Sequence, residues 1–316
     1  MSDLPTTPAA PIVASGSAHP AEVPAHLDDA ALARALGAGR PQGTWSTLEV
    51  DGVVCPRVQA GRGRAVLCVH GLGHDAWDWA PLFVRCSNDA ALTAFDLPGF
   101  GLSTKPARAW DLEVLVQALL ACARALPAPP VVVASSRGGH VALVAALRAP
   151  DAFAHLVLSA PGGLVEVPLA LQAMLRAYYA VDAIVARPEA EIVGNSRRIF
   201  ATPGLAASDA LAARKLAVHR SSAARAFAVP FAGVVDDVFR HVVLGRLTAL
   251  RVPCTFVTGE ADVVVPPDAV AAAALRLGAR LERWSGVGHC PHLEVPDRFA
   301  DLVRSCLRDG GPHVSR

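Results

Sequence analysis

Ser136 stands where a buried strand turns abruptly into a helix, a position from which a serine can act as a nucleophile. The β-branched run Val131–Val133 predicts a short buried strand, and apolar residues recur at helical spacing from Val141 onward. Ala134 and Gly138 are small, as a tight, strained turn requires. The Ser136 hydroxyl would then lie at a helix N-terminus, where backbone N–H groups can face a developing oxyanion. Taken alone, the segment could also be a small-residue connector in an α/β protein.

A serine hydroxyl becomes a useful nucleophile only when a base removes its proton and a third group orients that base. Two later loops, each following a predicted strand, supply these groups as Asp262 and His289. The chain order Ser, Asp, His is the order that this geometry requires on a parallel sheet. Glu260 is the nearest rival for the acid, and His292 lies close to the predicted base. We therefore predict Ser136, Asp262 and His289 as the catalytic residues.

The segment His70-Gly71-Leu72-Gly73-His74 follows another predicted strand and could complete such a site. Its glycines allow the backbone to turn an N–H group toward an oxyanion. We predict that the N–H groups of Leu72 and Arg137 form the oxyanion hole, and that Gly71 contacts the substrate. His70 is expected to brace this loop, and His74 to be exposed near the mouth of the pocket.

Composition excludes several function classes. The chain has 316 residues, enough for a sizeable core, and its net charge of +1 offers no field for nucleic acid. Arginines interrupt the apolar runs, so no membrane span of about 18 residues is expected. No residues have the spacing of metal ligands, and no phosphate-binding loop follows the first strand, so neither a metal nor a cofactor is predicted. The expected partner is a small-molecule substrate; the oligomeric state is open.

The seven scattered cysteines form no C-x-x-C pair and fall largely within apolar patterns. They are predicted to be reduced core thiols, which indicates a cytoplasmic setting. Residues 1–40 are predicted as a flexible N-terminal tail with one short helix over Leu27–Leu36. The stretch Met1–Pro24 is rich in Pro, Ala, Ser and Thr and lacks the basic start of a signal peptide.

Beyond the tail, continuous apolar strands alternate with helical patterns, which predicts a mostly parallel sheet covered on both faces. Asp51-Gly52 predicts a two-residue hairpin that adds antiparallel edge strands. The predicted strands are Trp45–Val50, Val53–Val58, Ala65–Val69, Ala91–Phe95, Val131–Val133, His155–Leu158, Cys254–Thr258 and Arg280–Trp284. The predicted helices are Ala76–Cys86, Asp111–Leu126, Gly139–Leu147, Asp268–Leu277 and Pro296–Arg308.

The alternation stops after Leu158, and the stretch from Ser159 to Pro253 is far longer than a crossover needs. We therefore divide the chain into a core (41–160 and 251–316) and a helical cap (161–250). The cap should fold over the carboxyl ends of the strands, where such sheets bind ligands. Tyr178, Phe227 and Phe231, with Tyr179 nearby, are predicted to form its apolar ceiling over the substrate. The predicted cap helices are Pro168–Ala186, Glu189–Phe200, Ala206–His219 and Ser222–Leu250, the last interrupted by Pro230.

In combination, these motifs resemble the α/β-hydrolase fold family, specifically its cap-bearing branch of esterases, C–C hydrolases and haloperoxidase-like enzymes. The matching segments are His70–Gly73, Phe95–Ser103, Ala134–Gly139, Gly259–Asp262 and Gly288–Glu294. The resemblance implies a doubly wound, mostly parallel sheet with a helical cap between the sixth and seventh core strands. It also implies a structural role for Asp96. One departure is Ala134, in place of the usual first glycine. The other is Ser135 and Arg137, which stand where a bulkier or apolar neighbour is common, so the Arg137 guanidinium should lie near the pocket or pair with a carboxylate.

Members of this family that open epoxides or remove halides carry an aspartate where this chain has Ser136. The resemblance therefore implies acyl chemistry, and we predict hydrolysis of small to medium, largely apolar carboxylic esters. Alternatives with the same triad are a C–C hydrolase of vinylogous diketones, a lactonase, a thioesterase or a cofactor-free perhydrolase. A C–C hydrolase should carry cationic cap residues, for which Arg176, Arg197 and Arg198 are candidates. A non-catalytic binding protein of the same fold is the remote alternative.

Overall fold

Eight short strands form one sheet in the order β1-β2-β4-β3-β5-β6-β7-β8. The computed structural model describes residues 30–107 and 110–309. The pairs β1–β2 and β2–β4 are antiparallel, and all other neighbouring strands are parallel. The strands are β1 (Thr44–Val50), β2 (Val53–Ala60), β3 (Arg64–Val69), β4 (Ala90–Phe95), β5 (Val131–Ser135), β6 (His155–Ser159), β7 (Cys254–Gly259) and β8 (Arg280–Trp284).

The predicted hairpin joins β1 to β2. Asp51 and Gly52 have φ angles of 51° and 78°. Both angles are positive, as a type I′ turn requires, and Val50 pairs directly with Val53 across the turn. The prediction of antiparallel edge strands is confirmed.

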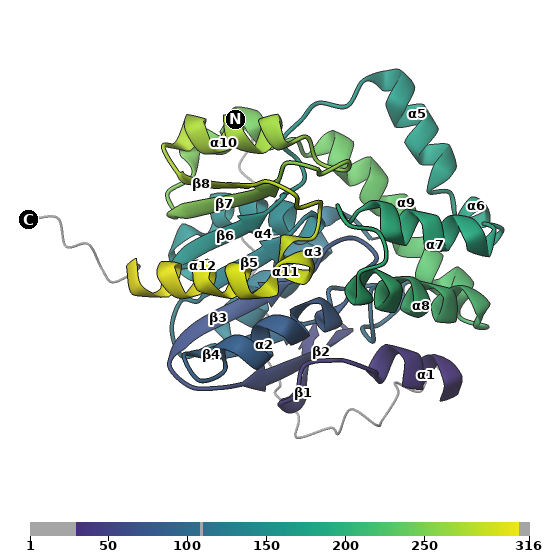
Figure 1. Ribbon diagram of the computed structural model, residues 1–316, viewed down its shortest axis with the longest axis horizontal. Helices are drawn as coiled ribbons and strands as arrows, with labels where there is room; N and C mark the ends of the chain where they lie inside the picture. The colour runs from purple at the N-terminus through teal and green to yellow at the C-terminus, as the bar shows by residue number, and fades with distance from the viewer. Residues whose placement is uncertain (1–29, 108–109, 310–316) are drawn as a thin grey trace, which may run out of the picture.

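Helices cover both faces of the sheet, as Figure 1 shows. On one face, the short 3₁₀ turn η1 (Ala76–Trp79), α2 (Ala80–Cys86) and α12 (Pro296–Asp309) enclose one buried apolar cluster. On the other face, α3 (Leu112–Arg124), α4 (Arg137–Arg148) and α10 (Pro267–Leu277) enclose a larger one. The strands contribute alternate side chains to the two clusters, because successive residues of a strand point to opposite faces. The predicted doubly wound architecture is confirmed.

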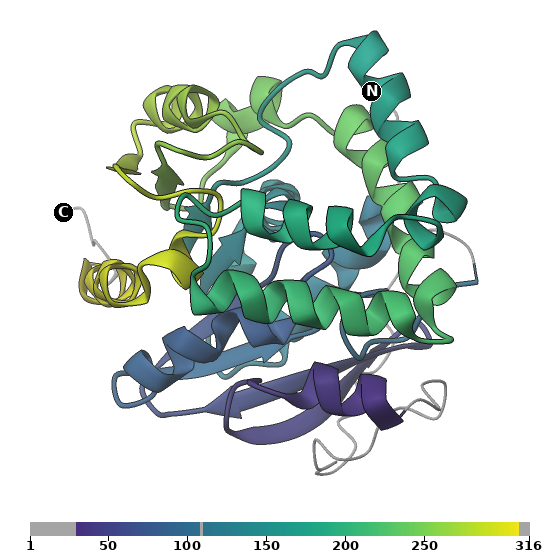
Figure 2. The same ribbon diagram turned by 45° about the vertical axis from the view of Figure 1, so that its right-hand side comes forward.

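All the helices of the long insertion lie between β6 and β7 and gather at one end of the sheet (Figures 1 and 2). They are α5 (Leu169–Tyr178), α6 (Val181–Val185), α7 (Glu189–Arg198), α8 (Ala206–Arg220) and α9 (Ala224–Arg240), followed by the 3₁₀ helix η3 (Leu244–Ala249). The helix predicted over Pro168–Ala186 is therefore two helices, which are separated at Tyr179 and Ala180.

The prediction that Pro230 interrupts its helix is wrong, because α9 continues through it. Proline removes one backbone hydrogen bond from a helix, a cost that tertiary packing can offset. Pro230 is buried and packs against Gly99 of the core, where an added Cβ would lie 2.7 Å from Pro230 Cγ. The helix ends instead at Arg240, ten residues after the proline.

The remaining differences are at element ends. The predicted helix over Ala76–Cys86 begins as the 3₁₀ turn η1, and the short helix α11 (Pro291–Glu294) was not predicted. The N-terminal helix α1 spans Ala30–Gly37, and the predicted tail up to residue 29 lies outside the described residues. The seven cysteines are buried and form no disulfide with one another. Across the part of the chain that the structure describes, no helix is both long and apolar enough to cross a bilayer.

Candidate active site

Ser136 occupies a strained turn between β5 and α4. Its φ of 51° and ψ of −116° lie in a region that side-chain-bearing residues rarely adopt. Three hydrogen bonds hold this backbone. The Ser136 N–H donates to Ser159 O at 2.8 Å, and the Ser136 carbonyl accepts from the N–H groups of His140 and Gly162 at 3.1 and 3.0 Å. The predicted strand, sharp turn and helix are therefore present, with the serine at the apex.

Two glycines near Ser136 lie where neighbouring segments come so close that little room is left for a side chain. A Cβ at Gly138 would lie 2.5 Å from the carbonyl oxygens of both Val69 and His70, so no larger residue fits there. A Cβ at Gly71 would lie 3.3 Å from Ser136 Cβ. The loop after β3 and the turn after β5 thus pack directly on each other, which brings the predicted oxyanion donors and the serine into one place.

Asp262 and His289 form a buried pair. The Nδ1 atom of His289 lies 2.8 Å from Asp262 Oδ2. The other oxygen of this carboxylate accepts hydrogen bonds from the N–H groups of Val264 and Val265 at 2.7 and 3.0 Å. Both Asp262 oxygens are thus held, which fixes the imidazole and leaves its Nε2 to act as a base.

The rival residues lie elsewhere. Glu260 is exposed and faces Arg283, with 3.4 Å between Oε1 and Nε. His292 is buried beside Trp79, on which its ring stacks.

Ser136 and His289 line the same cavity, which has a volume of about 1040 Å³. No hydrogen bond between Ser136 Oγ and the imidazole is found among the described residues; such contacts are often long until substrate binds. The N–H groups of Leu72 and Arg137 find no acceptor within the described parts of the chain. Leu72 lines the cavity as well.

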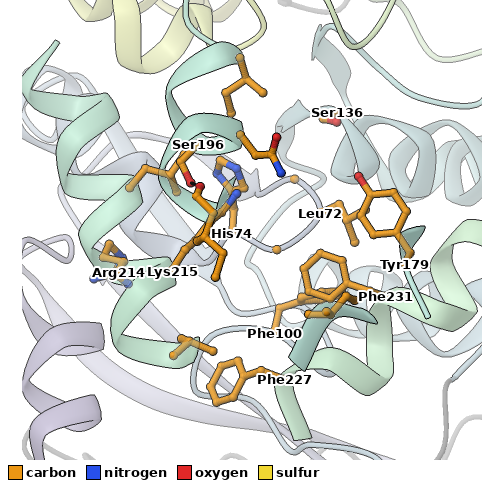
Figure 3. A pocket seen from close by; sticks show the side chains of 18 of the residues that line it. Leu72, His74, Phe100, Ser136, Tyr179, Ser196, Arg214, Lys215, Phe227 and Phe231 are labelled. Atoms are coloured by element: carbon orange, nitrogen blue, oxygen red, sulfur yellow. Dashed lines mark hydrogen bonds between the residues drawn. The ribbon is translucent and has the colours of Figure 1, made fainter. Parts of the chain in front are cut away.

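The predicted cap residues Tyr178, Phe227 and Phe231 also line the cavity, as does Gly71. Figure 3 shows Tyr179, Phe231 and Phe100 together near Leu72 and Ser136. The rings of Tyr179 and Phe231 stack with centroids 6.0 Å apart, and Phe100 meets Phe231 edge-on at 5.8 Å. These aromatic side chains give the cavity an apolar wall. No cluster of three or more His, Cys, Asp or Glu residues that could hold a metal ion occurs in residues 30–107 or 110–309.

Residues 66–302 match the sequence profile of the Alpha/beta hydrolase family. The chain belongs to this family. An uncharacterized protein of Mycobacterium tuberculosis is 28% identical over 261 residues, which are 77% of this chain and 75% of that protein.

Two solved structures are each 20% identical and show the likeness of fold. One is a thermophilic esterase from Thermogutta terrifontis, with a TM-score of 0.70 over 84% of this chain and 97% of that one. The other is the meta-cleavage product hydrolase CumD, with a TM-score of 0.71 over 83% and 97%.

In this hydrolase, Arg137 pairs with a cap carboxylate rather than lining the cavity. Its Nη2 donates to Asp237 Oδ2 of α9 at 3.1 Å, and its Nη1 donates to His140 Nδ1 at 3.0 Å. The Nε2 of His140 in turn donates to His241 O at 2.7 Å. Burial lowers the pKa of Arg137 to about 10, although Asp237 opposes the shift. Arg137 therefore ties α4 to α9 of the insertion.

His70 braces the loop after β3, as expected. Its Nδ1 donates to Gly71 O at 2.8 Å, and its Nε2 accepts from the Leu97 N–H at 2.9 Å.

The expectation that His74 is exposed is wrong, because only 8% of its side chain is accessible. It hydrogen-bonds to Asp78, and burial lowers its pKa although Asp78 opposes the shift.

Asp96 is structural, as the resemblance implied. Its carboxylate accepts from the N–H groups of Ala76 and Leu102 and from Arg40 Nη2, at 2.8, 2.7 and 2.6 Å.

Several residues of the cavity were missed by the sequence reasoning. Lys215 of α8 and Leu36 of α1 line it, and Arg214 anchors α8 beside it. Leu36 carried a weak signal, since it lies in a predicted helix that had no assigned role. Lys215 carried a clearer one, since it is one of only two lysines in the chain, the other being Lys105.

Proposed function

We propose that this hydrolase cleaves carboxylic esters through an acyl-enzyme, with residues 161–250 acting as a cap over the substrate. Ser136 is the nucleophile, His289 the base and Asp262 the residue that orients it. The observation that carries the proposal is that Ser136, at a positive φ, opens onto the same cavity as a histidine whose Nδ1 is fixed by a buried carboxylate. The structural likeness to an esterase supports it.

The steps follow from these positions. Ser136 Oγ attacks the ester carbonyl while His289 Nε2 takes its proton. The N–H groups of Leu72 and Arg137 stabilise the oxyanion. His289 then returns the proton to the leaving alcohol, and water attacks the acyl-enzyme by the same route. Asp262 keeps the imidazole in the tautomer with hydrogen on Nδ1 and stabilises the imidazolium.

The aromatic wall supports an apolar substrate of small to medium size. Each methylene buried against it should strengthen transition-state binding by somewhat under about 0.8 kcal/mol until the cavity is full. The seven buried thiols without a disulfide support a reducing, cytoplasmic compartment.

The test is the kcat/KM of the full chain for para-nitrophenyl esters from acetyl to palmitoyl. We expect kcat/KM to rise with chain length and then fall once the chain outgrows the cap. Ser136→Ala should lower turnover by several powers of ten while the protein stays folded, because the triad acts as a unit. A flat profile would remove the apolar-ester assignment. Labelling of another serine by a fluorophosphonate would remove the assignment of the nucleophile.

C–C hydrolysis remains the second candidate, supported by the likeness to a meta-cleavage product hydrolase and by one cap arginine. Arg198 lines the cavity. Arg176 and Arg197 instead pair with carboxylates outside it, those of Asp236 and Asp209. Assaying a vinylogous diketone, a lactone, a thioester and peroxide-dependent oxidation beside the esters separates the candidates. A binding protein would turn over none of them.

A further inference from the structure

Lys215 places a cation in the cavity without a counter-ion. It lies on α8 and lines the cavity with Ser136 and His289. Figure 3 shows it beside Arg214 and His74, across the cavity from Leu72, Tyr179 and Phe231. Over residues 30–107 and 110–309, no carboxylate comes within ion-pair distance of its ammonium, and no hydrogen-bond acceptor contacts it. One wall of the cavity is therefore aromatic, and the opposite wall carries a positive charge.

The acidic side chains that line the cavity already have partners. The pairs are Asp75 with Arg214, Asp78 with His74, and Glu191 with Arg187. The pair of Asp78 and His74 interacts electrostatically with the lysine. The charge of Lys215 lowers the pKa of His74, and the charge of Asp78 raises the pKa of Lys215. Lys215 faces this pair without forming a contact to it.

The chain uses lysine sparingly. Lys105 and Lys215 are the only lysines among 29 basic residues. The Lys105 ammonium donates to the carbonyl oxygens of Gly101 and Ser103 at 2.8 and 2.6 Å and stabilises a core loop. Lys215 has no comparable structural contact within the described residues. A lysine ammonium is a compact charge with three rotatable donors, which suits the end-on binding of one anionic group.

The environment of Lys215 favours binding of an anion. Burial lowers the pKa of Lys215, and the Arg187 charge lowers it further, while Cys290 and Asp78 act in the opposite direction. A partly desolvated ammonium without a partner costs free energy, which an anion of opposite charge can offset on binding. Ser196 lies close by in Figure 3 and donates its hydroxyl to Ile192 O at 2.8 Å, and among the described residues no hydrogen bond joins it to Lys215.

We propose that Lys215 binds a carboxylate at the end of an ester substrate remote from the scissile carbonyl, with the apolar chain held against Tyr179 and Phe231. The preferred substrates are then monoesters of dicarboxylic acids, or esters whose alcohol part carries the carboxylate. This inference rests on the proposed ester hydrolysis and adds the chemistry of the substrate's far end.

The experiment compares matched esters. The para-nitrophenyl monoesters of adipic and suberic acid are paired with the para-nitrophenyl esters of hexanoic and octanoic acid. A second series carries the carboxylate on the alcohol part. We expect the wild-type protein to prefer the carboxylate-bearing ester in at least one series. Lys215→Met should raise KM for that ester about 10- to 100-fold, the range for a charge-assisted hydrogen bond, with kcat little changed.

Three further variants separate recognition from support of the fold. Lys215→Arg should keep most of the preference, and Lys215→Glu should reverse it toward an ester that ends in an ammonium group. Arg220→Met removes a basic residue of the same helix that pairs with Glu189 outside the cavity. This variant should leave kcat and KM unchanged for both the anionic and the neutral esters. If Lys215→Met raises KM equally for neutral and anionic esters, the lysine merely balances the charge of Asp78 and the proposal is overturned.

A binding measurement separates this inference from the proposed activity. Calorimetry on Ser136→Ala should show monomethyl suberate, which keeps one carboxylate, binding more tightly than neutral methyl octanoate, and Lys215→Met in that background should abolish the difference. Equal binding of the two esters overturns the proposal even where ester turnover is intact. Absence of turnover with every ester, beside a retained preference for monomethyl suberate, would overturn the ester assignment and leave the carboxylate site standing.

Discussion

At the scale of single residues, the loop after β7 offers two carboxylates, and only Asp262 contacts His289. Its oxygens are divided between the imidazole and two backbone N–H groups. Glu260, two positions earlier, points to the exposed guanidinium of Arg283. The difference arises from the backbone, because the N–H groups of Glu260 and Ala261 bond to the carbonyls of Trp284 and Val287 and turn the loop toward β8.

Asp262→Asn should lower kcat by about 10³- to 10⁴-fold with little change in KM, because an amide can hold the imidazole in the wrong tautomer. Glu260→Gln should leave both constants within about twofold, as expected for a surface pair. Steady-state kinetics on one chromogenic ester checks both variants. A larger loss in the Glu260 variant would show that the acid has been misassigned.

His140 should make the folded state sensitive to acid. Burial lowers the pKa of His140 to about 3, and the neighbouring Arg137 charge adds to the shift. The ring must stay neutral because its Nδ1 accepts a hydrogen bond from that guanidinium. Since the folded-state pKa lies below the ordinary value of 6.5, the unfolded chain binds the proton first. The stability that the neutral His140 ring contributes is fully present above about pH 6.5 and is lost as the pH falls toward 3.

From about pH 7 to about pH 5, wild-type protein should lose about 2 kcal/mol more of its free energy of unfolding than His140→Gln does. Urea titrations at the two pH values measure the difference. The His140→Gln variant should have the lower free energy of unfolding at about pH 7, and this free energy should change less with pH than that of the wild-type protein. Parallel curves for the two proteins would mean that His140 takes up its proton in the folded state as easily as in the unfolded one.

At the scale of elements, one arginine joins three segments around the cavity. Arg214 of α8 donates from Nη1 to the carbonyls of Ala35, Leu36 and Ala38, and from Nη2 to Asp75 Oδ2. The last carbonyls of a helix lack intrahelical partners, so a cation there satisfies them and complements the helix dipole. Burial raises the pKa of Asp75, but Arg214 and Arg40 outweigh this and keep it below its usual value. The N-terminal helix is thereby anchored to both the helical insertion and the core.

Arg214→Met should cost about 3–5 kcal/mol of stability, the range for removing one partner of a buried ion pair. It should also raise KM, because Leu36 of α1 lines the cavity and would lose its anchor. The matched control is Arg220→Met on the same helix, whose exposed pair with Glu189 is worth at most about 1 kcal/mol. Equal denaturation midpoints for the two variants would contradict the role assigned to Arg214.

At the scale of the whole molecule, the sequence predicts what depends on local pattern. The hairpin at Asp51-Gly52, the strands and the turn at Ser136 follow from residue type and spacing over a few positions. The side of the cavity formed by α8 cannot be predicted from such local patterns, because its position depends on contacts between segments far apart in the chain. Arg214 and Asp75 are 139 residues apart, and helical spacing alone cannot indicate that they meet. Pro230 shows the same limit, since packing on Gly99 offsets its usual effect on a helix.

The insertion between β6 and β7 also affects how the chain is made. Cys254, where β7 begins, follows Ser159, where β6 ends, by 95 positions (254 − 159). At about 5–20 residues per second, a ribosome needs about 5–20 s to supply the strand that covers this edge. During that time the buried, apolar residues of β6 lack their neighbour, so the nascent chain presents an edge open to wrong pairing. His289 emerges later still, 153 positions (289 − 136) after Ser136, so for about half of its synthesis the chain carries the proposed nucleophile without the proposed base.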